Sequence, residues 1–133
     1  MATNFEVIRS WYETRARGET PDDIYADDIE WDEGGPGHPY GGTFRGLEVI
    51  EQEVFAKIGR DWEQLRMVPS QFIDGGDTII VLGKDHGRVR GGDQEFVCDT
   101  VHAYWMRDGK VVRFRQYTDT ASWHAALNRA HRG

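Results

Sequence analysis

Apolar residues recur at the spacing of a helix in two segments of the first half of the chain. The first segment spans residues 5–17 and is ended by Gly18, and the second spans residues 47–58 and is ended by Gly59. Between them, a proline is placed to open a short helix over residues 21–25. The pattern therefore predicts three helices before the middle of the chain.

The remainder of the chain is typical of strands followed by one closing helix. The turn signal Asp108-Gly109 predicts a hairpin with a two-residue turn, and apolar spacing predicts the closing helix over residues 120–129. Because helices come first and a long antiparallel meander follows, the fold class is α+β. We see neither a repeat nor a boundary, so residues 1–133 are expected to form one domain. The predicted strands are residues 29–33, 62–73, 78–90, 95–107 and 110–119.

A glycine-rich segment, GGPGHPYGGTFRG, fills residues 34–46. Glycine and proline predict a loop, and the aromatic rings of Tyr40 and Phe44 within it favour a packed loop over a floppy one. The glycine spacing matches neither a phosphate-binding loop nor the dinucleotide fingerprint, so we infer no nucleotide site here.

Composition narrows the class of protein. A net charge of −7 with no basic stripe argues against a nucleic-acid partner. No apolar run approaches the length of about 20 residues that spans a bilayer, and the N-terminus lacks the features of a signal peptide. We therefore expect a cytoplasmic protein without a membrane partner. Cys98 is the only cysteine, which excludes an intramolecular disulfide and favours an inert buried thiol.

The five histidines do not have the spacing of a metal site. None forms a helical pair of the zinc-binding kind, and His102 is predicted to lie opposite an arginine, which suits a cation poorly. We therefore expect no metal site.

The hairpin turn predicts which side chains share a face of the sheet. Simple pairing across the turn sets His102 opposite Arg115. Pattern alone favours an apolar core face and a solvated polar face. In the alternative, the polar face lines a pocket and a second subunit covers the apolar face. The predicted polar face carries Cys98, Thr100, His102, Tyr104, Arg113, Arg115, Tyr117 and Asp119, and the predicted apolar face carries Val101, Ala103, Trp105, Val112 and Phe114.

Three runs of sequence, YADDIEW, PYGGTFRG and DGKVVRFRQYTDTA, together resemble SnoaL-like proteins. These belong to the nuclear transport factor 2-like superfamily, with polyketide cyclases, ketosteroid isomerases and limonene epoxide hydrolases. The resemblance implies a cone-shaped, curved antiparallel sheet wrapped around N-terminal helices, with a pocket for a small hydrophobic organic ligand. It also implies a homodimer formed through the outer face of the sheet.

The resemblance implies roles for individual residues. Asp119 matches the acid/base aspartate of polyketide cyclases, and His102 goes with it as a second catalytic candidate that could relay a proton. Asp119 could instead cap the closing helix, and His102 could be a satisfied buried histidine. The substrate-binding candidates are Trp11, Trp31, Glu33, Tyr40, Arg115 and Tyr117.

Other members of the superfamily carry over less well. The ketosteroid isomerase positions hold Trp31 in place of the general base and Trp11 near the oxyanion-hole tyrosine. Asp119 matches the second catalytic aspartate of the epoxide hydrolases. Their Asp-Arg pair should fall near His86 and Arg88, where we find no aspartate at the needed position. Two function classes stay open. One is a cofactor-independent isomerase, cyclase or hydrolase acting on a hydrophobic, oxygen-bearing molecule, and the other is a non-catalytic binding or dimerisation module.

Overall fold

The computed structural model describes residues 2–132. The first helix, α1 (Asn4–Ala16), starts where expected because the side chain of Thr3 accepts a hydrogen bond from the backbone N–H of Glu6 at 3.1 Å. Its buried face carries Ile8 and Tyr12. Within the described residues, no helix is both long and apolar enough to cross a membrane.

The predicted short helix over residues 21–25 is wrong. This stretch leads directly into a strand, β1 (Tyr25–Asp32), which begins earlier than predicted. The carbonyl of Ile24 accepts a hydrogen bond from the backbone N–H of Val111 at 2.8 Å. Pairing with a distant strand therefore overrides the local helical signal.

The second predicted helix is present but interrupted. It consists of α2 (Leu47–Ile50), a π-helical turn η1 (Glu51–Phe55) and α3 (Ala56–Asp61) in unbroken succession. Gly59 does not end it, and the helix runs on to Asp61.

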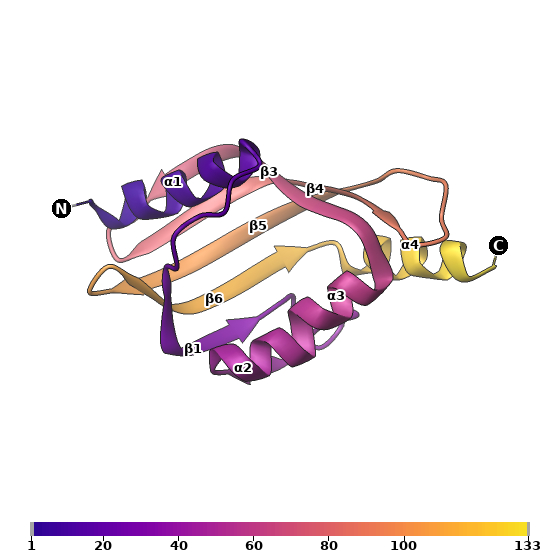
Figure 1. Ribbon diagram of the computed structural model, residues 1–133, viewed down its shortest axis with the longest axis horizontal. Helices are drawn as coiled ribbons and strands as arrows, with labels where there is room; N and C mark the ends of the chain where they lie inside the picture. The colour runs from indigo at the N-terminus through magenta and orange to yellow at the C-terminus, as the bar shows by residue number, and fades with distance from the viewer. Residues whose placement is uncertain (1, 133) are drawn as a thin grey trace.

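Within residues 2–132, six strands form one mixed sheet in the order β2-β1-β6-β5-β4-β3. Figure 1 shows β1, β6, β5, β4 and β3 of this sheet. Strand β1 pairs parallel with β6, which the expected all-antiparallel sheet did not include, whereas the other neighbours are antiparallel. The helix α4 (Thr120–Arg132) closes the chain. The remaining strands are β2 (Thr43–Arg45), β3 (Trp62–Asp74), β4 (Thr78–Val89), β5 (Phe96–Arg107) and β6 (Lys110–Thr118).

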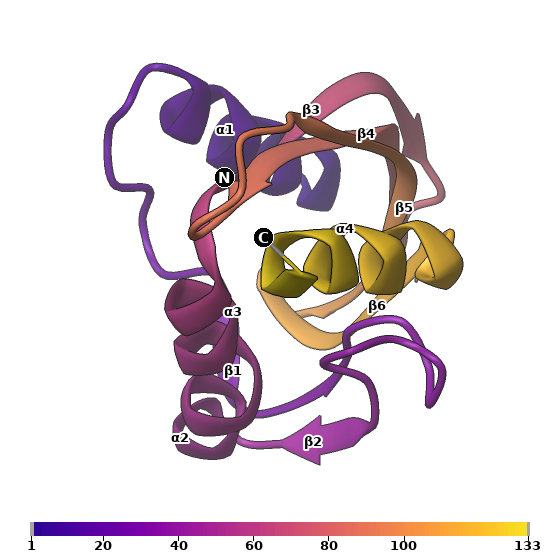
Figure 2. The same cartoon turned by 90° about the vertical axis from the view of Figure 1, so that its right-hand side faces the viewer.

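The sheet is strongly curved and does not close on itself (Figure 2). Helix α1 packs on β3 and β4, α2 on β1 and β2, and α4 on β4 and β5. The α+β class is thus confirmed. The main core lies between the concave face and the helices, and its fully buried aliphatic side chains are Ile8, Ile29, Ile50, Val54, Ile79, Val81 and Val111.

The β5–β6 hairpin departs from the predicted register after two pairs. Asp108 and Gly109 both have positive φ, as a tight hairpin turn requires, and Arg107 faces Lys110 as predicted. The register then shifts, so that Trp105 faces Arg113. The shift is a β-bulge, which adds one residue on β6 and turns the rest of that strand over.

This bulge corrects the predicted assignment of faces. His102 pairs with Gln116 in place of Arg115, and Tyr104 pairs with Phe114. Phe114 therefore lies in the core, only 2% exposed, and not on the apolar outer face.

The glycine-rich loop is packed, as predicted. A Cβ atom on Gly41 would lie 1.7 Å from the carbonyl oxygen of Gly35, so only glycine fits there. The loop carries His38 and Tyr40 into a second core cluster, where the His38 ring lies 4.7 Å from the ring of Trp123.

Candidate active site

A cavity of about 450 Å³ lies between the concave face of the sheet and the helices α1 and η1–α3. Trp31 stacks on Phe114 with 3.9 Å between ring centroids, and Phe55 meets the edge of Trp31 at 5.2 Å. Phe55 lies on the π-helical turn, a feature that occurs frequently at functional sites. The large apolar and aromatic residues in the wall include Trp11, Tyr12, Tyr25, Trp31, Phe55, Leu65, Met67 and Phe114.

Glu33 brings a buried carboxyl group to this wall. It follows the last residue of β1 and is 7% exposed, and its Oε2 accepts a hydrogen bond from the indole Nε1 of Trp31 at 2.6 Å. Burial raises the pKa of Glu33 from 4.5 to about 8, although the hydrogen bond from Trp31 opposes the rise. Glu33 is therefore mostly protonated at neutral pH and can act as an acid.

Asp85 brings a second buried carboxyl group, from the middle of β4. It is 4% exposed and lies between Met67 on β3 and Cys98 on β5. Its Oδ2 is buried and has no hydrogen-bond partner among the described residues. Burial raises the pKa of Asp85 from 3.8 to about 7, and the Thr100 hydroxyl opposes the rise. A carboxyl group in this state is poised to accept a proton.

A histidine and two tyrosines form a hydrogen-bonded chain in the same wall. The Tyr12 hydroxyl oxygen lies 2.5 Å from Nδ1 of His102 and 2.7 Å from the hydroxyl oxygen of Tyr104. On the other side of the ring, Nε2 of His102 lies 3.0 Å from Oε1 of Gln116. Burial lowers the pKa of His102 from 6.5 to about 4, so the imidazole is neutral at neutral pH.

The two carboxyl groups influence one another. A charge on Asp85 raises the pKa of Glu33, so ionisation of one disfavours ionisation of the other. Two carboxyl groups that disfavour each other's ionisation therefore share one apolar cavity, an arrangement suited to paired acid and base chemistry. The described residues include no group of three or more His, Cys, Asp or Glu side chains suited to a metal ion.

Comparison with known families identifies the domain. Residues 8–114 match the model of the SnoaL-like domain. The chain belongs to the SnoaL-like domain family. No curated protein matches its sequence.

Solved structures resemble this SnoaL-like domain over nearly its whole length. A nuclear transport factor 2-like protein from Burkholderia thailandensis is 31% identical, with a TM-score of 0.84, and the match covers 96% of this chain and 98% of that one. A nuclear transport factor 2-like protein from Burkholderia pseudomallei is 24% identical, with a TM-score of 0.81 and coverage of 96% and 98%. TerC, co-crystallised with polyporic acid, is 26% identical, with a TM-score of 0.77 and coverage of 96% and 99%.

Four of the residues singled out from the sequence lie together in the cavity wall: Trp11, Trp31, Glu33 and His102. Glu33 is buried. Their chemical roles stay predictions.

Tyr40 does not line the cavity. Its hydroxyl donates a hydrogen bond to Asp61 at 2.8 Å and accepts one from the indole of Trp62 at 3.0 Å. It anchors the glycine-rich loop in the second core cluster, which was the alternative considered from the sequence.

Arg115 and Tyr117 point to the outer face, contrary to the expectation that they face inward. The bulge in β6 is the reason, because it reverses the side to which both side chains point. Arg115 donates a hydrogen bond to Asp32 at 3.0 Å and lies 4.6 Å from the ring centroid of Tyr117. Tyr117 is 50% exposed.

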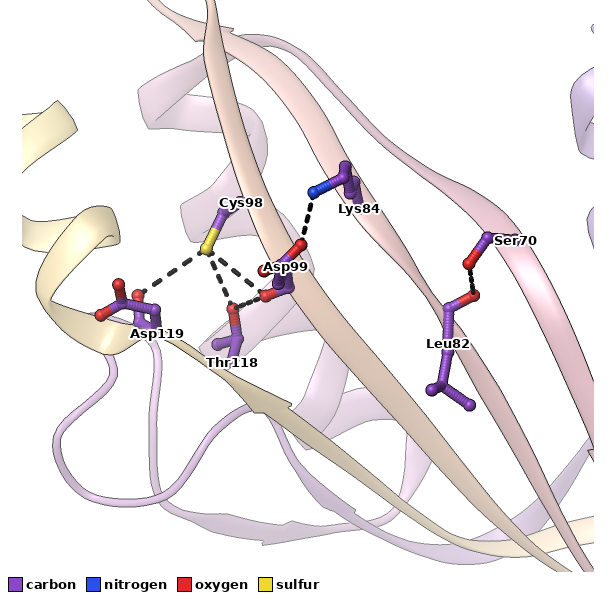
Figure 3. Close-up of polar contacts among 7 residues, drawn as sticks. All are labelled: Ser70, Leu82, Lys84, Cys98, Asp99, Thr118 and Asp119. Atoms are coloured by element: carbon purple, nitrogen blue, oxygen red, sulfur yellow. Dashed lines mark hydrogen bonds and ion pairs between the residues drawn. The ribbon is translucent and has the colours of Figure 1, made fainter.

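Asp119 is exposed and lies outside the cavity wall, so the expectation that it faces the pocket is also wrong. Its carboxylate accepts hydrogen bonds at the start of α4, from the backbone N–H of Ala121 at 3.1 Å and from the Ser122 hydroxyl at 2.8 Å. Its backbone carbonyl accepts a contact from the Cys98 thiol at 3.8 Å (Figure 3). This geometry is that of a helix cap.

The polar wall residues that sequence reasoning did not single out as site residues include Tyr12, Asp85, Tyr104 and Gln116. A signal for Asp85 was available, because Asp85 is in phase with the buried Ile79 and Val81 of the same strand. The sequence could not place Gln116 in the cavity wall, because the β-bulge that pairs it with His102 was not predicted.

Proposed function

We propose that this SnoaL-like domain is a cofactor-independent enzyme that moves a proton on a hydrophobic, oxygen-bearing small molecule. The observation that carries the proposal is the pair of buried carboxyl groups, Glu33 and Asp85, in one apolar cavity with pKa values raised to about 8 and about 7. Buried acids with strongly shifted pKa values cluster at functional sites. Isomerisation, cyclisation and hydrolysis all need such a step.

The two groups take different roles. Asp85 has the lower pKa and an unpartnered Oδ2, so it is the general base that removes a proton from carbon or from water. Glu33 keeps its proton, and Trp31 occupies Oε2, so Oε1 carries the proton toward the oxygen of the substrate. Asp119, the candidate favoured by family resemblance, is replaced in this role by Asp85.

The test is a proton-exchange reaction on a simple ketone. 2-Tetralone is hydrophobic and has acidic C–H bonds beside its carbonyl group, and their exchange in D₂O is followed by proton NMR. The wild-type protein should accelerate exchange, and Asp85→Asn should slow it by about 100-fold, a typical contribution of a general base. A bell-shaped pH profile is expected, rising as Asp85 ionises and falling as Glu33 loses its proton.

Asp119→Asn is the matched control, because it makes the same substitution outside the cavity and retains a capping side chain. It should exchange 2-tetralone at the wild-type rate. Exchange that is lost in Asp119→Asn and kept in Asp85→Asn would contradict the assignment.

The second function class, a non-catalytic binding module, is favoured by the match to TerC, which was crystallised with polyporic acid. Polyporic acid is therefore a suitable trial ligand, with quenching of tryptophan fluorescence as the measurement. Binding of polyporic acid without any exchange of 2-tetralone would favour the binding module over the enzyme.

The homodimer also stays a proposal. Its surface is the outer face of the sheet, where Val97 is 48% and Tyr117 50% exposed and where Trp105 lies under the guanidinium of Arg113 at 4.3 Å. Light scattering should report about twice the chain mass at micromolar concentration, falling to one chain mass in Trp105→Glu. A wild-type monomer would contradict it.

A further inference from the structure

The hydrogen-bonded chain in the cavity wall has a direction that the contacts themselves fix. Nε2 of Gln116 lies 2.7 Å from the backbone carbonyl oxygen of Glu33, which can only accept. The amide nitrogen therefore donates there, and the amide oxygen Oε1 faces Thr100, whose hydroxyl donates to it at 3.2 Å, and His102.

This orientation sets the tautomer of His102. Because Oε1 of Gln116 only accepts, Nε2 of His102 must carry the hydrogen. The ring is neutral, so Nδ1 is bare and accepts the hydroxyl hydrogen of Tyr12. Gln116 is thus a positioning residue for the histidine.

The same reasoning extends to Tyr104. Tyr12 has one hydroxyl hydrogen, and His102 takes it, so the contact of 2.7 Å between the two tyrosines is a hydrogen bond from Tyr104 to Tyr12. This hydrogen bond raises the pKa of Tyr104 and lowers that of Tyr12, although burial raises both more strongly. Both phenolic hydrogens are then used within the protein.

We propose that the tyrosine pair of the cavity recognises a hydroxyl group of the ligand, phenolic or enolic, by accepting its hydrogen bond. Both tyrosines line the cavity, and only oxygen lone pairs are left to meet a ligand. A bare carbonyl or ether oxygen finds no donor at this pair. This inference rests on the proposed function only in placing the ligand in the same cavity, and it names a substrate class that carries a hydroxyl group.

The experiment compares two probes of similar shape, 2-naphthol and 2-methoxynaphthalene, by isothermal titration calorimetry. An apolar cavity without a polar partner would bind the ether more tightly, because a buried hydroxyl group without a partner is unfavourable. The wild-type protein should instead prefer 2-naphthol by about 5-fold, as one neutral hydrogen bond allows. Equal binding, or a preference for the ether, overturns the proposal.

Two variants locate the preference. Tyr12→Phe leaves the Tyr104 hydroxyl free to donate and leaves Nδ1 of His102 without its donor, so 2-methoxynaphthalene should gain affinity relative to the wild-type protein. Asp85→Asn should retain the preference, and loss there with retention in Tyr12→Phe would assign the hydroxyl to Asp85 and overturn the proposal. Exchange of 2-tetralone by the wild-type protein reports separately on the proposed function, because 2-tetralone has no hydroxyl group for the tyrosine pair to accept.

A measurement on the unaltered protein keeps the test independent of variants. Long-range proton–nitrogen correlation spectra distinguish a protonated from a bare ring nitrogen. They should show Nε2 of His102 protonated and Nδ1 bare at neutral pH. The opposite tautomer would reverse the chain and overturn the proposal.

Discussion

The indole Nε1 of Trp31 donates a hydrogen bond to Oε2 of Glu33 across 2.6 Å, inside a mostly apolar wall. The two residues alternate around Asp32 at the end of β1, so an i, i+2 spacing brings both to the same side. The hydrogen bond steadies the carboxyl group but does not offset the unfavourable burial of its charge, because the pKa of Glu33 remains about 8. The raised pKa of Glu33 should affect both the alkaline stability of the protein and the pH dependence of its activity.

Stability should fall as the solution becomes alkaline. The pKa of Glu33 rises from 4.5 to about 8 on folding, so its contribution is complete below about pH 4.5 and is lost as pH rises through about 8. The pKa of Asp85 rises from 3.8 to about 7 on folding, so its contribution to stability is likewise lost as pH rises. Urea denaturation should therefore give a smaller free energy of unfolding at about pH 9 than at about pH 6. Glu33→Gln keeps an acceptor for Trp31 and should reduce that difference by about 1 kcal/mol or more. An unchanged difference would argue that Glu33 is not buried.

The hydrogen bond from Trp31 should tune the alkaline limit of activity. Trp31→Phe retains an aromatic ring but removes the donor that lowers the pKa of Glu33, so that pKa should rise further. In the 2-tetralone exchange assay, the falling limb of the pH profile should move to higher pH, while the rising limb set by Asp85 stays in place. Trp11→Phe, another exchange of indole for phenyl in the wall, provides the control and should move neither limb. Movement of both limbs in Trp31→Phe would point to a general change of the cavity.

Acid should destabilise the protein through His38. Burial, with a smaller contribution from His124, lowers its pKa from 6.5 to about 4. A histidine with a lowered pKa contributes stability above about pH 6.5 that is lost as pH falls toward about 4. His38→Asn can still accept the hydrogen bond that Tyr40 N–H makes to Nδ1 at 3.1 Å, and it has no charge to bury. The free energy of unfolding should then fall less between about pH 6.5 and 4.5 in the variant, with His102 causing the remaining loss. An equal loss in both proteins would contradict this role.

Asp119 should matter for stability and not for chemistry. Asp119→Ala removes the side-chain acceptor for Ala121 N–H and the Ser122 hydroxyl, and should lower the free energy of unfolding by about 1 kcal/mol. Thermal and urea denaturation measure this directly, and Asp119→Asn should lie much closer to wild type. A variant of unchanged stability with lost exchange activity would restore Asp119 as the acid/base group.

The sequence was sufficient for the first helix, the four long strands β3–β6 and the closing helix, because helical and strand periodicities are local properties. Asp108-Gly109 also predicted the turn correctly. The pocket face of β6 could not be predicted, since one bulge beside Val111 exchanges the two faces of everything that follows it. Buried acids are similarly hard to recognise from the sequence. Asp85 lies in phase with buried residues of β4, but its position indicates a site only once its neighbours are known to enclose a cavity. Asp119 was favoured because it ends the last strand, yet the end of a strand is also where a helix begins.

Replacing Gln116 by glutamate should reverse the hydrogen-bonded chain. A carboxylate beside Nε2 of His102 favours the charged imidazolium and should raise its pKa by about 1–3 units, as opposite charges at contact distance do. Nδ1 then carries a hydrogen and donates to Tyr12, Tyr12 donates to Tyr104, and the Tyr104 hydroxyl is free to donate into the cavity. Titration of the His102 ring nitrogens by NMR should show the rise, and the preference for 2-naphthol over 2-methoxynaphthalene should shrink at pH values where the ring is charged.

Gln116→Met is the control for Gln116→Glu, because it distinguishes the effect of the added charge from the effect of losing the amide group. It removes the acceptor for Nε2 without adding a charge, so His102 should stay neutral and its tautomer should no longer be fixed. If His102 stays neutral in Gln116→Glu as well, the introduced carboxyl group has taken up a proton itself. The chain would then keep its wild-type direction, and the preference for 2-naphthol should remain that of the wild type.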